Sequence, residues 1–454
     1  MARSLPLLML VVVGLLPAPL VLSAIPSSTI SKIGRYAVRA EQTRKIRKFL
    51  TEHAGDVLGF ILGIFPSSGG KKGDDKQGSA AATTAGLYMF NLSIGTSAPQ
   101  IVTGILDIGL NFIWAQCAPC DPCLALPAPT FQPNMSATFS TLPCASQTCQ
   151  SALNQTCGAA VDDTCGYLID YGDGTNTTGY LANDTFVFGP SAAPGVVFGC
   201  SDASAGDFSG ASGAFGFGRG NLSLVTQLQV PWFSYLLAPD DYDGDSGLQF
   251  GDGAAPRSKR SHSTPLLQSS MYPDLYYVKL IGIQVSGQEL TGIPAGTFDL
   301  RADGSGGVFL STTIPATYLE QAAYEVVKQA FRSGIPSEPV NGSAVGLDLC
   351  YMKQSLDEIK IPTLTLVFDG TNAAMELKEE NYFFTDSSTG LECLSILPFQ
   401  GVSLLGNLLQ MDTTMTYDIY GGQLIFDTAL APPPHLMVSV MAAVQLAAWA
   451  LLLF

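Results

Sequence analysis

Asp107 is the residue whose type and position best suit chemistry. It ends the apolar run 104–107, and Gly109 and a second apolar run up to Trp114 follow it. A glycine two positions after an acid permits a tight turn, so the segment predicts a carboxylate on a loop between two buried strands. A carboxylate held in that way can act as a general acid or base. The same pattern also occurs in ordinary hairpin turns, and the segment alone does not separate the two interpretations.

The composition excludes several other kinds of chemistry. The chain has 454 residues, a formal net charge of -16 and a sequence pI near 4.5. Such an acidic protein repels nucleic acid and suits an acidic extracellular or vacuolar environment. Its only imidazoles are those of His53, His262 and His435, so neither a histidine-based catalytic triad nor a zinc site is expected. No phosphate-binding motif occurs, and we expect neither a metal nor a cofactor.

The two apolar ends of the chain and seven glycosylation motifs point to the secretory pathway. Residues 1–24 carry Arg3 and then a long apolar run, which predicts a signal peptide. The tail, 431–454, ends in nineteen uncharged residues with no Lys or Arg after them. It predicts a cleaved signal for a lipid (GPI) anchor, or else a membrane-spanning helix. Motifs of the form Asn-x-Ser/Thr, at which glycosylation is expected, begin at Asn91, Asn134, Asn154, Asn176, Asn183, Asn221 and Asn341.

In a secreted chain, ten cysteines are expected to form disulfides. Cys350 and Cys393 lie alone in the second half and are predicted to pair with each other. The other eight are an even number whose connectivity the sequence does not fix: Cys117, Cys120, Cys123, Cys144, Cys149, Cys157, Cys165 and Cys200. The C-x-x-C-x-x-C spacing at the start of this group also fits a metal cluster, but the lack of nearby histidines favours disulfides.

Residues 25–80 form a basic segment and a linker. Seven cations between Lys32 and Lys48 alternate with apolar residues at helical spacing, and a flexible Gly/Ser/Lys/Asp-rich stretch follows. One interpretation is a solvated, disordered segment. The other is a pro-segment whose positive face covers an acidic cleft. The charge run alone does not decide between them.

The elements that must position Asp107 are short strands. Between Leu87 and Thr428 the chain alternates β-type runs, such as 88–94, 276–283 and 363–368, with Gly, Pro, Asn and Asp, which predicts an all-β body. One helix is expected from about Leu319 to Phe331. Apolar residues recur there every three to four positions, at Ala322, Val326, Val327 and Phe331.

A weak internal repeat relates the two halves of this body. An apolar run into Asp107 is followed about a hundred residues later by Ala-Phe-Gly at 214–216. A second apolar run, into Ser311, is followed by Leu-Leu-Gly at 404–406. The repeat predicts two related lobes that face each other across a cleft. We place them at 81–255 and 256–430.

Several motifs occur in a characteristic order. They are the strand 91–96, Asp107-Ile-Gly109, Trp114-Ala-Gln-Cys117, the hairpin Tyr171-Gly-Asp-Gly-Thr175, Phe198-Gly-Cys200, and the segments 216–224, 405–407 and 417–426. Together they resemble the pepsin-type aspartic proteases, and the cysteine-rich insert from 117 to 165 is typical of the plant nepenthesin-like branch. The resemblance covers most of 87–428. It implies an all-β, bilobal, pepsin-like fold with a central cleft and few short helices.

The resemblance also implies a reaction. In this family two aspartates share a proton: one takes a proton from a bound water and the other donates to the scissile carbonyl, with the split pKa values for which the family is well known. By resemblance Asp107 is the first of the two. Tyr171, Trp114 and Gly109 are implied to bind substrate, with Tyr171 on a flap and Trp114 as its hydrogen-bond partner.

The second half departs from the family pattern without a change in spacing. Ser311 stands where the second aspartate belongs, Thr313 replaces a glycine, and Ile314 replaces a hydroxyl residue. In the first loop, Ile108 and Leu110 replace hydroxyl residues that in the family bond across the lobes and to the carboxylates. Such losses are expected to leave the surviving carboxylate poorly oriented.

Without an opposing carboxyl, the pKa of Asp107 is expected to lie near the free value of about 3.9. Asp299 and Asp303 are close to Ser311 in sequence but are expected at the far end of the approaching strand, out of reach.

Two function classes therefore remain open. The missing second aspartate favours a catalytically impaired or inactive pseudo-protease that binds a peptide or protein ligand in the cleft. The alternatives are a working aspartic endopeptidase that uses Asp107, or an inhibitor of glycan-degrading enzymes on the same scaffold. In each case we expect a monomer that passes through the secretory pathway to the cell exterior, the cell surface or the cell wall, attached to a membrane through its tail.

Overall fold

The computed structural model describes most of the chain from 87 to 428 and one strand before it. The described residues are 29–35 (backbone only), 87–127, 129–152, 155–157, 163–171, 175–239, 246–255, 262–370 and 372–428. The predicted signal peptide, most of the basic segment and the apolar tail lie outside them. Among the described residues, no helix is both long and apolar enough to cross a membrane.

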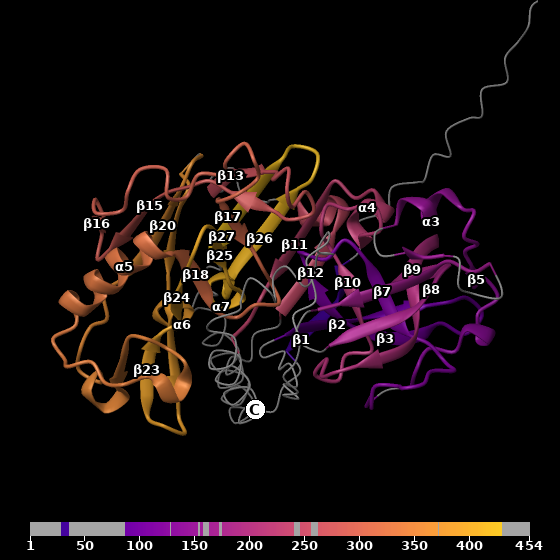
Figure 1. The fold of residues 1–454 in the computed structure, drawn as a ribbon, viewed down its shortest axis with the longest axis horizontal. Coiled ribbons are helices and arrows are strands. Elements are labelled where there is room, and N and C mark those ends of the chain that lie inside the picture. Colours follow the sequence, from indigo (N-terminus) through magenta and orange to yellow (C-terminus); the bar gives the residue numbers. More distant parts are fainter. Residues whose placement is uncertain are drawn as a thin grey trace, which may run out of the picture.

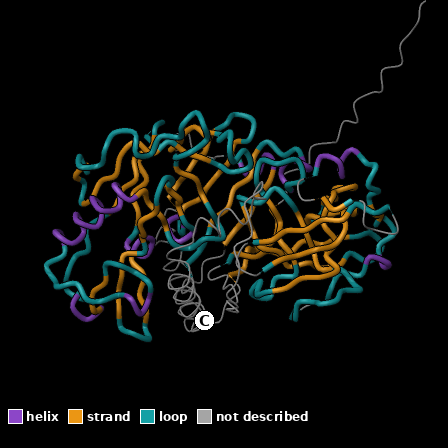
Figure 2. The backbone as a smooth tube through the Cα atoms, in the orientation of Figure 1, coloured by secondary structure: helices purple, strands orange, loops and turns teal. Residues whose placement is uncertain are grey.

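The first half of the body is built almost entirely of strands (Figures 1 and 2). Its strands are β2 (Tyr88–Ile94), β3 (Gln100–Asp107), β4 (Ile113–Gln116), β5 (Ser140–Thr141), β6 (Gln155–Thr156), β7 (Gly166–Asp170), β8 (Asn176–Phe188), β9 (Ser191–Ala205) and β10 (Gly213–Gly216). Its short helices are η1 (Pro133–Met135), α3 (Gln147–Ser151) and α4 (Leu224–Leu228).

The second half has shorter strands and one longer helix. Its strands are β14 (Tyr277–Val278), β15 (Leu280–Val285), β16 (Gln288–Glu289), β17 (Val308–Leu310), β18 (Thr317–Glu320), β19 (Cys350–Met352), β20 (Leu364–Phe368), β21 (Ala374–Leu377), β22 (Phe383–Asp386), β23 (Leu391–Leu394), β24 (Ile396–Phe399) and β25 (Ser403–Leu405). Its helices are α5 (Gln321–Gly334), η3 (Ser343–Val345), η4 (Lys353–Ser355), α6 (Glu379–Tyr382) and α7 (Asn407–Gln410).

One antiparallel sheet joins the two halves, and in Figure 1 its central strands lie between them. Its strands, in order of pairing, are β1 (Thr29–Arg35), β12 (Ser246–Phe250), β11 (Trp232–Leu236), β26 (Thr413–Asp418), β27 (Gln423–Thr428) and β13 (His262–Leu267), with η2 (Gly251–Ala254) after β12. At the seam between β11 and β26, the rings of Phe233 and Tyr417 stack with centroids 4.4 Å apart. The halves therefore share a hydrogen-bonded sheet and a buried aromatic contact.

The same arrangement of three strands occurs once in each half. β10 runs parallel to β3 and antiparallel to β4, and β25 runs parallel to β17 and antiparallel to β18. β3 ends at Asp107, and β17 ends directly before Ser311. A Cβ at Gly216 or at Gly406 would lie 2.3 Å from a backbone carbonyl oxygen of the neighbouring loop, so only glycine fits at either place. The weak sequence repeat thus corresponds to a structural repeat.

The sequence-based elements agree with the structure, with three differences. The helical spacing of the basic segment is wrong for its described part, because 29–35 form the strand β1, which pairs with β12 and β2. α5 begins two residues later than expected, because Glu320 caps it by accepting a hydrogen bond from the Ala322 N–H. The run 276–283 is not one strand: β14 pairs with β13 and β17, whereas β15 turns to pair with β16 and β20. A change of sheet within one apolar run leaves no mark on its hydrophobic pattern.

The disulfide predictions are confirmed. Cys350 and Cys393 pair with each other, and their Cα atoms lie 4.0 Å apart. The connectivity that the sequence left open is Cys117–Cys200, Cys120–Cys123, Cys144–Cys157 and Cys149–Cys165. The cysteines of the C-x-x-C-x-x-C run are thus all in disulfides, and none of the described cysteines is free.

Candidate active site

Asp107 lies at the end of β3 with its side chain buried. Only 5% of the residue is exposed to solvent. Its Oδ1 atom accepts hydrogen bonds from the backbone N–H groups of Gly109, at 2.8 Å, and Leu110, at 3.2 Å. The tight turn that Gly109 was expected to permit is therefore also the cradle of the carboxylate.

The expected pKa of Asp107 is wrong. Burial raises the pKa of this carboxyl from 3.8 to about 6, and the two backbone hydrogen bonds offset only part of the shift. The neighbouring Ile108 and Leu110 are buried, and the Leu275 side chain packs over Gly109, at 3.2 Å from where a Cβ would be. The absence of a second carboxyl alone does not set this pKa. The buried apolar side chains of Ile108 and Leu110 beside the carboxyl contribute to its desolvation.

Ser311 occupies the corresponding position in the second loop. Its Oγ atom accepts hydrogen bonds from the backbone N–H groups of Thr313, at 3.2 Å, and Ile314, at 3.1 Å. These are the residues two and three positions later, as for Asp107. The hydroxyl of Thr313 lies 3.2 Å from Ser311 Oγ. Where the first loop holds a carboxylate over a glycine, the second holds a serine beside a threonine hydroxyl.

A threonine between these residues joins the two loops. Thr312 Oγ1 donates to the Leu106 carbonyl at 2.7 Å and accepts from the Ile108 N–H at 3.2 Å. The predicted pairing of the two loops is therefore confirmed. Only the second loop contributes a side chain to this contact, because Ile108 in the first loop has no hydroxyl. Thr312 is not among the predicted site residues, although its place next to Ser311 in the repeat could have indicated it.

Tyr171 and Trp114 form the predicted hydrogen bond. Trp114 Nε1 donates to the Tyr171 hydroxyl at 2.9 Å, and the Phe208 ring packs edge-on against both side chains. Trp114 is fully buried in an apolar cluster against which Tyr171 also packs. The tip of the hairpin, Gly-Asp-Gly at 172–174, lies outside the described residues. The Tyr171 hydroxyl is thus held by the indole of Trp114, as expected of the pair from the sequence.

Asp299 and Asp303 do not supply a second carboxylate. Asp303 is exposed and accepts hydrogen bonds from the backbone and hydroxyl of Ser305 in its own turn, which lowers its pKa. Asp299 is exposed as well. Both lie in the loop that leads into β17, as expected, and neither is hydrogen-bonded to the Ser311 loop.

A buried polar chain supports the second loop from below. Gln410 Nε2 donates to the Ser311 carbonyl at 2.9 Å, and Gln410 Oε1 accepts from the Tyr235 hydroxyl at 2.5 Å. The Tyr235 hydroxyl lies 3.0 Å from that of Tyr417, across the seam between the halves. No sequence signal could have singled out this glutamine, because its role depends on the shared sheet.

Comparison with known proteins decides the family. Residues 88–252 match the family model described as xylanase inhibitor N-terminal, and 275–428 match the one described as xylanase inhibitor C-terminal. Aspartic proteinase nepenthesin-1 of Nepenthes gracilis is 39% identical over 348 residues, which cover 76% of this chain and 78% of that protein. Nepenthesin-2 of the same plant is 38% identical over 338 residues, 74% of this chain and 75% of that protein. The chain belongs to the nepenthesin-like aspartic protease family.

The similarity of this nepenthesin-like chain extends to other plant proteins and to solved structures. Aspartyl protease family protein 2 of Arabidopsis thaliana is 31% identical over 396 residues, 86% of this chain and 80% of that protein. The crystal structure of EDGP covers 77% of this chain and 92% of its own, at 18% identity and a TM-score of 0.59. The crystal structure of basic 7S globulin from soybean covers 78% of this chain and 92% of its own, at 19% identity and a TM-score of 0.58. The two structural similarities, both under 25% identical, show only the fold, which is bilobal and pepsin-like.

Proposed function

We propose that this nepenthesin-like protein is a pseudo-protease, which binds a peptide or protein segment in the cleft between its lobes but does not cleave it at a useful rate. The observation that carries the proposal is Ser311 in the cradle that matches that of Asp107. Peptide hydrolysis by this family needs one carboxylate to take a proton and a second to give one.

The surviving chemistry of the site is limited. A single carboxyl with a pKa of about 6 is either protonated or ionised at a given moment, so it cannot act as acid and base in the same step. The hydroxyls of Ser311 and Thr313 do not ionise near neutral pH and so cannot take its place. The remaining polar groups are the carboxyl of Asp107 and the hydroxyls of Ser311 and Thr313, which suit hydrogen bonding to a peptide backbone.

The binding half of the machinery is retained. The bond between Trp114 and Tyr171 is present, and the turn at Gly109 keeps its close approach to Asp107. We therefore expect purified mature protein to bind labelled peptides, with the peptide recovered intact by mass spectrometry. Replacing Tyr171 by Ala should weaken binding by roughly tenfold, the scale of one buried aromatic contact. Binding that is unchanged in this variant would place the ligand elsewhere.

A slow endopeptidase is the rival function. It is favoured by the intact Asp107 and by relatives that are named aspartic proteinases. An inhibitor of glycan-degrading enzymes is a further possibility, favoured by the descriptions of the two family models. The corresponding assay measures the rate of a purified xylanase with and without the protein: a lowered rate would support this alternative, and an unchanged rate removes it.

We further propose how the protein reaches its site of action. Five disulfides are typical of a chain that folds in the secretory pathway. On this proposal residues 1–24 are removed as a signal peptide and 25–80 act as a pro-segment. The asparagines of the motifs carry glycans except Asn91, which lies in β2, and a lipid replaces the apolar tail of a monomeric protein. Phospholipase treatment of intact cells should then release it. Retention, with the 436–454 peptide still detectable by mass spectrometry, would indicate a spanning helix instead.

A further inference from the structure

A cavity of about 360 Å³ lies in the first lobe, between the cysteine-rich insert and the loop that follows β9. One wall is the insert at Leu124 and Ala125, and the other is formed by Ser204, Asp207 and Phe208. This volume lies at the low end of the range of ligand pockets and is enough for one long side chain. Nothing in the proposed chemistry at Asp107 uses it.

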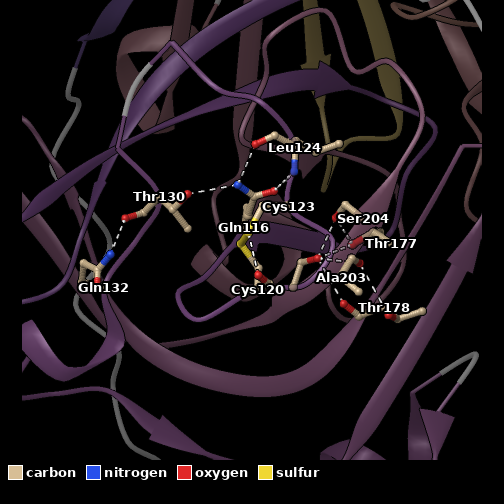
Figure 3. The surroundings of a disulfide bond; sticks show 11 residues. Gln116, Cys120, Cys123, Leu124, Thr130, Gln132, Thr177, Thr178, Ala203 and Ser204 are labelled. Carbon is tan, nitrogen blue, oxygen red and sulfur yellow. Dashed lines mark hydrogen bonds between the residues drawn. A yellow bond between two sulfur atoms is a disulfide. The ribbon is translucent and has the colours of Figure 1, made fainter.

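The walls of this cavity are held in place without a ligand. Gln116, which is 1% exposed, accepts from the Leu124 N–H at 2.6 Å and donates to the Leu124 carbonyl at 3.3 Å and to Thr130 Oγ1 at 3.0 Å (Figure 3). The Cys120–Cys123 disulfide closes the same loop. The Ser204 N–H donates to the Pro122 carbonyl at 3.0 Å, which ties the two walls together. The cavity is therefore preformed, which lowers the entropic cost of binding.

The cavity adjoins the predicted flap tyrosine. Phe208, one of its wall residues, packs with its ring centroid 5.7 Å from that of Tyr171 and 5.1 Å from that of Trp114. A peptide held beneath Tyr171 would thus have this cavity directly beside it. The insert loop that forms the opposite wall is exposed at Ala125.

The charge of this lobe selects the kind of side chain. Residues 87–255 contain fourteen aspartates, no glutamate, no lysine and no histidine, and their one cation is Arg219, so their formal charge is -13. Arg219 does not neutralise the cavity, because its guanidinium lies over the Tyr276 ring, 5.0 Å from the centroid, and it is not among the wall residues. Asp207 places a carboxylate in the wall itself. A field of one sign attracts the opposite charge.

We infer that this cavity binds the side chain of a lysine or arginine from a peptide that lies in the cleft. The aliphatic stem would pack against Leu124, Ala125 and Phe208, and the cationic end would reach Asp207, with the Phe208 ring as a further partner for the cation. The inference rests on the proposed peptide-binding function and names the class of ligand that it prefers: a basic one.

The inference is tested with labelled peptides of Gly, Ser and Ala in which one test residue is placed at each position in turn. The test residue is lysine, arginine, norleucine or glutamate, and the binding of each peptide is measured with the wild-type protein and three variants. Asp207→Asn removes the wall charge but keeps the acceptor for the Ser209 N–H. Asp252→Asn, at an exposed aspartate of the same lobe outside the cavity, is the matched control. Ala125→Trp fills the cavity from an exposed position.

At one position, wild type should prefer lysine and arginine over norleucine by about fivefold, the scale of a partly exposed ion pair. Asp207→Asn should abolish that preference and Asp252→Asn should keep it. Ala125→Trp should weaken lysine, arginine and norleucine peptides alike by about tenfold, since the methylenes of all three lose their contacts. Equal effects of Asp207→Asn and Asp252→Asn would overturn the cavity assignment while leaving peptide binding in place. No binding of any peptide to wild type would overturn the proposed function together with it.

Discussion

Asp107 and Ser311 have almost the same backbone surroundings and very different chemistry. Each side chain accepts two hydrogen bonds, from the backbone N–H groups of the residues two and three positions later. In the first loop that cradle holds an ionisable group in an apolar setting, and burial raises its pKa to about 6. In the second it holds a hydroxyl that does not titrate. The two repeated loops therefore share one backbone geometry around two side chains of different chemistry.

The raised pKa of Asp107 makes a testable contribution to stability. At a pH below 3.8 both the folded and the unfolded chain hold this proton, so the carboxyl costs nothing. As the pH rises from 3.8 to about 6, the unfolded chain ionises freely, whereas the folded chain resists a buried charge. Stability is therefore lost over that window. At about 1.36 kcal/mol per pKa unit, the loss is about 3 kcal/mol above pH 6.

Asp107→Asn should remove that cost, because its Oδ1 can still accept from Gly109 and Leu110 and no charge is buried. We expect the variant to match wild type near pH 4 and to be more stable by about 3 kcal/mol above pH 6. Chemical denaturation at a series of pH values measures the difference. A stability difference between the two proteins that does not change with pH would contradict the raised pKa.

Restoring one aspartate should not restore catalysis. With Ser311→Asp alone, the Thr313 side chain still occupies the position at which the first loop has Gly109, beside the new carboxyl. We expect Ser311→Asp to leave peptide cleavage near background. Adding Thr313→Gly should raise it by on the order of 10²–10⁴, the usual contribution of a positioned acid. Cleavage by the single variant equal to that of the double variant would show that Thr313 does not obstruct the site.

At the scale of elements, Thr312 links β17 to β3 across the lobes. Its hydroxyl satisfies the Leu106 carbonyl and the Ile108 N–H, both of which are buried. Thr312→Val keeps the shape but leaves both groups without this partner, which should cost about 2–4 kcal/mol. Thr365→Val, in half-buried β20, should change stability by less than about 1 kcal/mol. Equal losses in the two variants, measured by chemical denaturation, would refute a special role for the cross-lobe bond.

How far the sequence predicts these elements depends on whether the signal is local. The turn at Asp107, the strand 88–94 and the helix α5 follow from residue types and periodicity, and the structure has all three. The cross-lobe bond of Thr312 and the support from Gln410 join residues far apart in the chain, for which periodicity carries no signal. The pKa of Asp107 likewise depends on its tertiary setting, since Asp107 is buried and Leu275 of the other half packs over the adjacent Gly109.

At the scale of the whole molecule, disulfides reinforce lobes that a shared sheet already joins. Cys350–Cys393 spans 43 residues and ties β19 to β23 in the second lobe. Replacing both cysteines by serine should lower the free energy of unfolding by about 3–4 kcal/mol in the chain-entropy model. Peptide mapping without reduction should recover the two wild-type peptides joined, and two separately alkylated peptides would refute the bond.

The central claim is that a pepsin-like molecule with one active-site carboxylate binds peptides without cleaving them. The measurement that tests it most directly is the cleavage of a denatured protein by the purified mature protein at acid pH, since the family's chemistry is strongest there. We predict no cleavage above the rate of a sample without the protein. Turnover that a transition-state mimic blocks and that Asp107→Ala abolishes would contradict the claim and establish a one-carboxylate protease.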